Sequence, residues 1–215
     1  MRNHWFPVST AVVLVLCASC AGSPADGSPE AVSGASPSGG GAVAAVTDSI
    51  APVTGSGKTL VVYYSQGSAT RRVAEDLALV FGADIERIVE LKARGTGFFG
   101  FMSLGAQATM GKPSAIETPS FDPAGYDLVI VLTPVFSWNL SPAVRAWLRL
   151  MKGKLAKAAY VTVSGDTEPD KIVAAMSKES GTAPVVFMGF GDADFAPENR
   201  AAYLGKLAVI VDALR

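Results

Sequence analysis

The sequence predicts a doubly wound α/β fold. We expect a five-stranded parallel sheet of order 2-1-3-4-5, with helices on both faces in three α/β/α layers. Three observations predict it. From residue 58 onward, short apolar segments alternate with amphipathic ones, as in a series of β-α units. The apolar segments are nearly continuous, which is typical of strands buried on both faces. Right-handed crossovers between parallel strands then leave few topologies.

The strand and helix signals follow one another in a regular order. We expect strands at residues 59–65, 85–91, 126–133, 158–163 and 184–188. Helices are expected at residues 70–81, 102–110, from 142 onward, 169–177 and 198–214, and a loop at residues 134–140. Ser141 and Pro142 form a helix start, with Ser as N-cap and Pro at the first helical position. Trp147 lies on the apolar stripe of that helix, which predicts a core position rather than a site.

Composition excludes several classes of function. The chain has 18 Lys and Arg against 19 Asp and Glu, so no basic excess indicates nucleic acid. Its only His is His4 and its only Cys are Cys17 and Cys20, so everything after Cys20 lacks both residue types. That part therefore has no disulfide, no Cys or His metal site, and no Ser-His-Asp or Cys-His catalysis. Redox chemistry there requires a bound cofactor.

Residues 1–20 have the character of an export signal. An apolar stretch too short to span a bilayer is followed by Cys17-Ala18-Ser19-Cys20. This segment resembles a bacterial lipobox, in which the Cys becomes the lipidated first residue of the mature protein. The resemblance implies lipidation at Cys20, with Cys17 standing where a Leu is usual. It places the protein in the cell envelope, held to the membrane by the lipid anchor only. An ordinary cleaved signal, which would release the protein, is the alternative.

Residues 21–57 consist mainly of Ala, Gly, Ser, Pro and Val, without aromatic residues or a sustained period. Such a segment buries too little apolar surface to order itself, so we expect a disordered tether that is dispensable for folding. The folded domain is expected at residues 58–215. Residues 55–59 (GSGKT) resemble the end of a phosphate-binding P-loop, but Pro52 occupies the position of its first Gly and the motif precedes the strand. We expect no nucleoside triphosphate there.

Ligands of doubly wound sheets bind beyond the carboxyl ends of the strands, near the switch between the first and third strands. The loop after the first strand combines hydroxyls with a helix start, a combination that favours an anion. With this loop the sequence resembles the flavodoxin family over residues 58–215. The resemblance implies that the loop holds the phosphate of FMN. Its residues are Ser65, Gln66, Gly67, Ser68, Ala69 and Thr70. The ends match the family's Ser-x-Thr-Gly-Asn-Thr, whereas the middle departs from it.

The second loop matches the family more closely. Thr133, Pro134, Val135 and Phe136 resemble its Thr-Pro-Val-Trp, which flanks the flavin ring. The resemblance implies that Phe136 supplies the stacking face, with Trp138 as a second candidate. Packing of both rings beneath the loop is the alternative.

The third loop, with Ser164, Gly165 and Asp166, resembles the family's short turn at the other edge of the ring. A negative charge at Asp166 would make the ring harder to reduce, and an ordinary acidic surface turn is the alternative. Tyr63, Tyr64 and Asp166 are the only candidates for a proton donor.

Two functions of different classes follow. The resemblance implies an exported, membrane-tethered FMN protein that transfers electrons to a redox partner or reduces a small acceptor; sequence does not separate a carrier from an enzyme. The alternative is a flavodoxin-fold binding or scaffold lipoprotein that has lost FMN, because a fold does not fix a function.

Overall fold

The computed structural model describes residues 46–55, 57–92 and 98–215. Its sheet has the order β2-β1-β3-β5-β6, and every neighbouring pair on this path is parallel. A short strand, β4, pairs antiparallel with the end of β3. The strands are β1 (Thr59–Tyr63), β2 (Asp84–Arg87), β3 (Leu128–Phe136), β4 (Asn139–Leu140), β5 (Ala158–Val163) and β6 (Pro184–Phe190). With β4 set aside, the predicted five-stranded order is confirmed.

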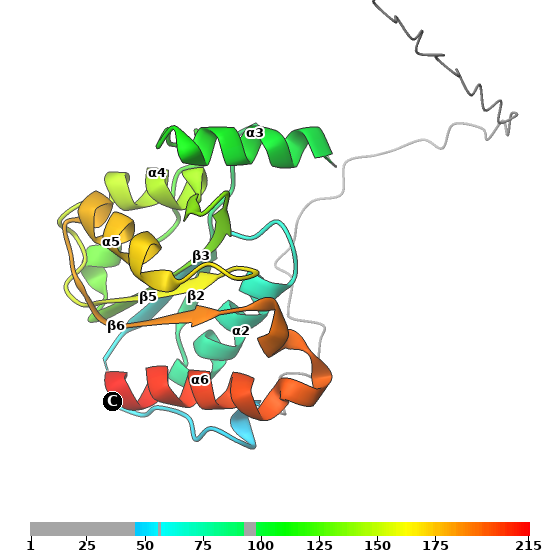
Figure 1. The fold of residues 1–215 in the computed structure, drawn as a ribbon. Helices are drawn as coiled ribbons and strands as arrows, with labels where there is room; N and C mark the ends of the chain where they lie inside the picture. The colour runs from blue at the N-terminus through cyan, green and yellow to red at the C-terminus, as the bar shows by residue number, and fades with distance from the viewer. Residues whose placement is uncertain (1–45, 56, 93–97) are drawn as a thin grey trace, which may run out of the picture. The chain divides into compact units, whose positions relative to one another are not determined.

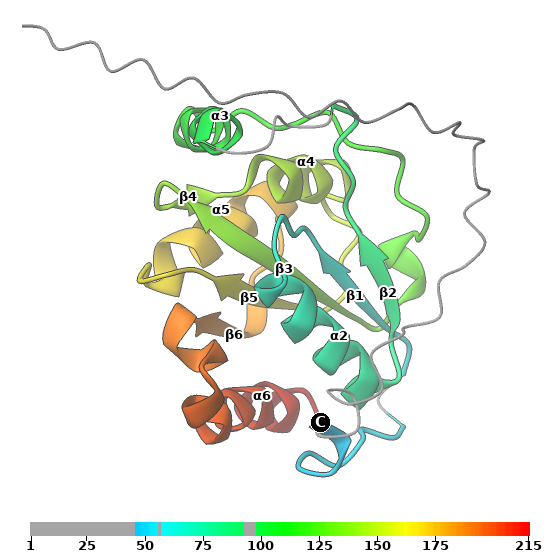
Figure 2. The ribbon, with the colours of Figure 1, turned by 90° about the vertical axis from the view of Figure 1, so that its right-hand side faces the viewer.

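Helices cover both faces of the sheet, giving three layers (Figures 1 and 2). They are α2 (Ala69–Phe81), α3 (Phe98–Thr109), α4 (Pro142–Leu150), α5 (Pro169–Ser180) and α6 (Arg200–Leu214). Short 3-10 turns are η1 (Pro123–Gly125), η2 (Asp192–Phe195) and η3 (Pro197–Asn199). One apolar core lies between the sheet and the pair α2 and α6, and the other lies beneath α3, α4 and α5. Within the described ranges no helix has the length and apolarity of a membrane span.

The stripe on α4 packs as its spacing predicts. Trp147 is 1% exposed and belongs to the core beneath α3, α4 and α5, which confirms the predicted core position. Ser141 precedes the helix and Pro142 begins it, also as predicted. The Ser141 side chain, however, makes no capping hydrogen bond, so the helix start depends on the Pro rather than on the hydroxyl.

Residues 134–140, expected to form a loop, form a β-hairpin instead. Strand β3 continues through Pro134 to Phe136 and returns as β4, with Val135 opposite Leu140. The two residues at the turn, Ser137 and Trp138, both have positive φ (47° and 58°). That is the geometry of a two-residue hairpin, which Asn-Gly usually signals in a sequence. Because Ser-Trp carries no such signal, sequence patterns do not predict this turn.

Parallel pairing places the expected site loops side by side. Tyr63 lies opposite Leu132 between β1 and β3, and Pro134 lies opposite Val163 between β3 and β5. The segments that follow β1 and β5 and the end of β3 therefore meet at one edge of the sheet. Ser164 N donates to Phe190 O at 2.9 Å, which fixes the segment after β5 beside β6.

The packed domain begins before residue 58, contrary to the expectation of a flexible tether through residue 57. Val46 is fully buried and Ile50 is 6% exposed, both in the core beneath α2 and α6. The backbone is also bonded to the domain, since Val53 N donates to Val80 O at 2.8 Å and Arg215 Nη2 donates to Ala51 O at 3.1 Å. Two isolated apolar residues in a polar stretch show no periodicity, so only the tertiary contacts show that they are core. Residues 1–45, with Cys20, lie outside the described residues.

A chain that begins at Lys58 is expected to be less stable than one that begins at Val46. Losing the burial of Val46 and Ile50 removes about 1.5–3 kcal/mol of hydrophobic stabilisation for each fully buried side chain. The loss is smaller to the extent that the unfolded chain already buries some of this apolar surface. The difference in free energy of unfolding, measured by urea titration of the two chains, checks this. Equal midpoints would mean that residues 46–57 contribute nothing to the fold.

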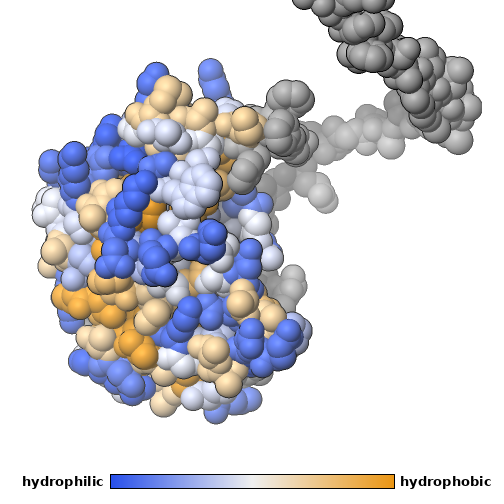
Figure 3. All heavy atoms as spheres, viewed as in Figure 1, coloured by the Kyte–Doolittle hydropathy of each residue, from blue (hydrophilic) through white to orange (hydrophobic). Residues whose placement is uncertain are grey.

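Strand β6 leaves apolar side chains at the edge of the sheet. Val185 and Phe187 are 52% and 41% exposed, and they point to the same face because side chains alternate along a strand. Figure 3 shows apolar surface at the lower left, where Figure 1 places β6.

Candidate functional site

The first loop leads into the N-terminus of helix α2, and the middle of the loop is exposed to solvent. Ser65 and Thr70 are each 4% exposed, whereas Gln66, Gly67 and Ser68 lie at the surface. The Ser65 hydroxyl donates to Gly67 O at 2.5 Å and so shapes the loop. Helix α2 then begins after Ser68, whose side chain makes no capping hydrogen bond. The N–H groups of its first turn have no partners within the helix, and the first turn contains no acidic residue. This arrangement suits an anion.

The middle of this loop, which departs from the family's pattern, adopts an unstrained backbone conformation. Gly67 does not have a positive φ, and a Cβ placed on it would meet no heavy atom within 4 Å. The conformation therefore does not depend on where the loop carries its Gly. The space beside Gly67 is open to a group that approaches the backbone.

Arg87, at the end of β2, was missed by the sequence reasoning. Its Nη2 donates to the Ser65 carbonyl oxygen at 3.1 Å, so a cation is held against the first loop from the neighbouring strand. Arg87 is otherwise exposed. Nothing in its local sequence distinguishes it from a surface arginine, because only the pairing of β2 with β1 brings it to this loop.

The other arginines near this helix start are engaged differently. Arg72 lies over the ring of Tyr203 from α6, 4.9 Å from its centroid, and Arg71 pairs with Glu75 on the surface at 3.8 Å. The Tyr203 hydroxyl donates to Asp76 Oδ2 at 2.5 Å inside the core. Burial raises the pKa of Asp76, while the hydrogen bond from Tyr203 opposes the rise. These contacts fix the position of α2 against α6.

The hairpin exposes one aromatic ring and buries the other. Phe136 is 7% exposed and packs edge-on against Tyr64, with ring centroids 6.5 Å apart, so it is a core residue and not an open stacking face. Thr133 is fully buried, with its hydroxyl donating to Pro134 O at 2.9 Å. Trp138, the second candidate, is 65% exposed at the hairpin tip.

A bulky residue in the left-handed region, as at Trp138, is a backbone outlier that persists only where its surroundings impose it. Asn139 Nδ2 donates to the Ser137 carbonyl at 2.5 Å across the turn. Helix α3 also approaches closely, because a Cβ on Gly105 would collide with the Ser137 hydroxyl. The turn is therefore held by a hydrogen bond within the hairpin and by the close approach of α3, and such strain is typical of functional turns.

We expect Trp138→Gly to raise thermal stability slightly while weakening flavin binding. Gly adopts positive φ without steric cost, so about 1 kcal/mol of strain is relieved, less the added entropy of the unfolded chain. The variant also loses the exposed ring, which the resemblance implies as a second candidate for the stacking face. Melting temperature and binding of FMN and riboflavin, measured on the same samples, check both effects. Trp138→Phe is the control, since it retains a ring together with the strain; equal flavin affinity in the Gly variant and wild type would remove Trp138 from the site.

The third loop is ordered by its own hydrogen bonds. Ser164 Oγ accepts from Thr167 N at 3.0 Å and donates to Thr167 O at 3.1 Å, which leaves Gly165 and Asp166 exposed at the tip. A Cβ on Gly165 would lie 3.4 Å from the carboxylate of Asp192, which begins η2. Two carboxylates therefore border this side of the site, so negative charge gathers where the resemblance places one edge of the flavin ring.

The two tyrosines considered as proton donors are buried. Tyr63 is 7% exposed, and burial raises the pKa of its hydroxyl. Tyr64 is 5% exposed; its hydroxyl donates to Glu90 Oε2 at 2.8 Å and accepts from Gln66 Nε2 at 3.0 Å. Of the three candidates, only Asp166 is exposed at the site edge.

Comparisons with known proteins agree with this architecture. No family model and no curated protein matches the chain. Among solved structures, an FMN complex of a flavoprotein from Lactobacillus acidophilus superposes with a TM-score of 0.55 at 20% identity, covering 64% of this chain and 95% of that one. Provisionally assigned flavoproteins of Bacteroides eggerthii and Bacteroides uniformis give TM-scores of 0.52 and 0.54 at 18% and 17% identity. They cover 69% and 70% of this chain, and 96% and 99% of their own. The described domain therefore has a flavodoxin-like fold.

Proposed function

We propose that this protein binds FMN at the carboxyl edge of its sheet and is a flavoprotein that transfers electrons. The observation that carries the proposal is the start of α2. An open loop there presents unpaired N–H groups with Arg87 held beside it, at the switch between β1 and β3. That the superposing Lactobacillus acidophilus flavoprotein was solved with FMN supports the same assignment.

The phosphate of FMN would be held by the first loop. The N–H groups at the start of α2 and the hydroxyls of Ser68 and Thr70 supply donors, and the helix dipole favours the negative charge. Arg87 adds a positive charge, with its guanidinium directed to this loop by the Ser65 carbonyl. The fit is supported by the open space beside Gly67.

The ring would lie between the β3–β4 hairpin and the third loop. Trp138 offers an exposed aromatic face on one side. On the other side, the N–H groups of Gly165 and Asp166 lie in a turn that the hydrogen bonds between Ser164 and Thr167 order. Bound FMN would supply one- and two-electron redox chemistry that no side chain of this domain supplies. The chain itself positions the ring, and its carboxylates at Asp166 and Asp192 oppose the build-up of negative charge there, which lowers the reduction potential.

Titration with FMN and with riboflavin tests the proposal directly. We expect saturable quenching of flavin fluorescence with both ligands, and tighter binding of FMN because only FMN reaches the start of α2. Potentiometry of the loaded protein would then give the potential. Absence of quenching at high micromolar FMN, with a cooperatively folded sample, would sink the cofactor assignment.

A binding or scaffold protein without FMN is the second candidate, and specific observations favour it. The aromatic at the family's stacking position, Phe136, is buried in the core, and the middle of the phosphate loop departs from the family. This candidate gains support if purified protein is colourless and stays so after FMN is added.

We further propose that the protein is exported and anchored by lipid at Cys20. The short apolar segment followed by Ala18-Ser19-Cys20 supports this. Cys20→Ser is expected to move the protein from the membrane fraction to the soluble fraction, because the acylation site is lost. Cys17→Ser is the matched control and should leave fractionation unchanged. A Cys20→Ser variant that remains with the membrane contradicts the anchor.

A further inference from the structure

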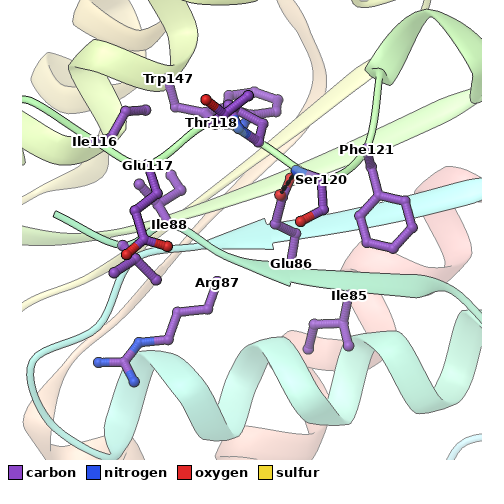
Figure 4. A pocket seen from close by; sticks show the side chains of 12 residues that line it. Ile85, Glu86, Arg87, Ile88, Ile116, Glu117, Thr118, Ser120, Phe121 and Trp147 are labelled. Carbon is purple, nitrogen blue, oxygen red and sulfur yellow. Dashed lines mark hydrogen bonds between the residues drawn. The ribbon is translucent and has the colours of Figure 1, made fainter. Parts of the chain in front are cut away.

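The two edges of the sheet are protected differently. At β2, residues 116–121 run beside the strand: Glu117 N donates to Val89 O at 2.9 Å, and Ser120 N donates to Glu86 Oε1 at 2.5 Å (Figure 4). Strand β6, at the other edge, pairs with β5 alone among the described strands. Proteins usually protect an open edge with charged residues or a covering segment, because it is a template for pairing with another chain. The sequence of β6, PVVFMGF, contains no charged residue.

The open part of β6 is limited to two residues. Phe190 O accepts from the segment after β5 at 2.9 Å, so the backbone of Phe190 is directed to β5. Backbone groups alternate in direction along a strand, so those of Val185, Phe187 and Gly189 are directed away from β5. Lys206 Nζ, from α6, already donates to Gly189 O at 2.9 Å. Among the described residues, none is hydrogen-bonded to the outward N–H and C=O groups of Val185 and Phe187.

These free groups specify one register with a second copy of the strand. In an antiparallel pair, two residues directly opposite each other exchange both N–H···O bonds, and such pairs recur at every second residue. Placing Val185 opposite Phe187 of the second copy, and Phe187 opposite its Val185, uses all of the free groups on both strands. Val186 then lies on a twofold axis, and Lys206 keeps its bond to Gly189 O.

The side chains of the same two residues complement each other in this register. Val186 and Met188 pack against the core beneath α2 and α6, so Val185 and Phe187 point to the α5 side, where they are 52% and 41% exposed. Each valine then lies against the phenylalanine of the other copy. A β-branched residue opposite an aromatic one is a pair that stabilises sheets, and twofold symmetry supplies it twice.

Helix α5 extends the contact on this face. It contacts both β5 and β6 and runs antiparallel to them, since it connects two parallel strands. A Cβ on Gly189 would lie 3.3 Å from the Pro169 ring, so the first turn of α5 lies beside the end of β6. The twofold axis brings this turn, with Asp170, toward the last turn of the other α5, with Lys178; both side chains are exposed. A helix over the boundary of β5 and β6 lies two strand spacings, or about 10 Å, from its symmetry mate, which is a helix-packing distance.

We propose that β6 pairs with β6 of a second copy of this chain, in the antiparallel register centred on Val186, to form a twofold symmetric dimer. An uncharged strand does not repel its own copy, and the opposite charges at the two ends of α5 favour this partner. The two sheets become one continuous sheet in which the carboxyl edges of the copies face opposite directions. The dimer does not depend on the proposed FMN site.

Sedimentation equilibrium of the full chain tests the dimer. Cys17→Ser and Cys20→Ser are included, because a chain without cysteine cannot be joined to a second copy by a disulfide or carry the lipid. We expect the average mass to rise from that of one chain toward that of two between about 1 and 500 µM, the range of weak interfaces. A mass that stays at one chain throughout overturns the proposal.

Charged variants locate the contact. Phe187→Lys should weaken association at least about tenfold, because two apolar pairs are lost and a charge enters each. Val185→Lys, at the other exposed position, should act alike. Ile85→Lys is the matched control at the β2 edge, since Ile85 is 39% exposed, and it should associate as the parent chain does. Cooperative urea unfolding shows that each variant is folded. Loss of association in Ile85→Lys, with none in the β6 variants, overturns the proposal.

Cross-linking tests the register. In the cysteine-free chain, Val186→Cys places two thiols opposite each other, at a Cα separation of about 4.5 Å that a disulfide spans. Met188→Cys carries its thiol on the same face, but its two copies lie about 14 Å apart. We expect mild oxidation to give a covalent dimer with Val186→Cys and none with Met188→Cys. Equal cross-linking of both, or of Met188→Cys alone, overturns the proposal.

Discussion

Replacing Glu179 with Ala is expected to lower the free energy of unfolding by about 3–5 kcal/mol at neutral pH. Glu179, on α5, accepts hydrogen bonds from Arg145 and Arg149 on α4; Arg149 Nε donates to Oε2 at 2.6 Å. The Arg145 side chain is only 10% exposed, and its Nε has no partner among the described residues. Loss of Glu179 therefore leaves a buried cation without its counter-charge, which costs far more than loss of a surface pair.

The contacts of Glu179 with both arginines also predict how this stabilisation depends on pH. The hydrogen bond from Arg149, followed by the bond and charge of Arg145, lowers the pKa of Glu179 from its usual value of 4.5. Because the folded-state pKa lies below the unfolded-state value, the stabilisation is fully present above about pH 4.5 and is lost as pH falls through the folded-state pKa. The difference between wild type and Glu179→Gln, from urea titrations at several pH values, should therefore shrink in acid.

The exposed pair between Arg71 and Glu75 provides the control, since Glu75→Gln should change stability by less than about 1 kcal/mol. A Glu179→Gln penalty that is equal at pH 7 and in acid would show that packing, and not charge, joins α4 to α5.

Arg87→Ala is expected to weaken FMN binding about tenfold to a hundredfold without changing riboflavin binding. Among the described residues, Arg87 is the cation whose side chain is hydrogen-bonded to the first loop, through the Ser65 carbonyl at 3.1 Å. A charge-assisted hydrogen bond to phosphate contributes about 1.5–3 kcal/mol, which corresponds to that range of affinity. Riboflavin has no phosphate, so it serves as an internal reference for the ring site.

Two further variants sharpen this experiment. Arg87→Lys keeps the charge but lacks the fork that serves both the carbonyl and a phosphate, so an intermediate loss is expected. Lys178→Ala removes a surface cation from the last turn of α5, at the opposite edge of the sheet, and should leave both flavins unaffected. The contribution of Arg87 should also decrease with added salt, because Arg87 is exposed. Equal losses for FMN and riboflavin would place Arg87 at the ring or in the loop's structure rather than at the phosphate.

The sequence alone determined the fold of this protein. Its buried strands are nearly continuous apolar runs, and the stripe on α4 has a helical period that places Trp147 in the core, as the structure confirms. Such patterns are local and repeat along the chain, so they are readable without tertiary contacts. Chain order and the handedness of crossovers then fixed the order of the strands, and with it the edge at which the loops after β1 and β5 meet the end of β3.

The tertiary structure decided which side chains occupy that edge. Phe136 and Trp138 are two residues apart and equally aromatic, yet only a two-residue turn with positive φ at Ser137 and Trp138 buries the first and exposes the second. Arg87 reaches Ser65 across 22 positions because β2 pairs with β1. Val46 is a core residue only because it packs in one apolar cluster with residues of α2 and α6. Each of these outcomes depends on contacts between segments distant in the chain, or on a turn that has no sequence signal. The periodicity of apolar residues along the chain carries no information about either.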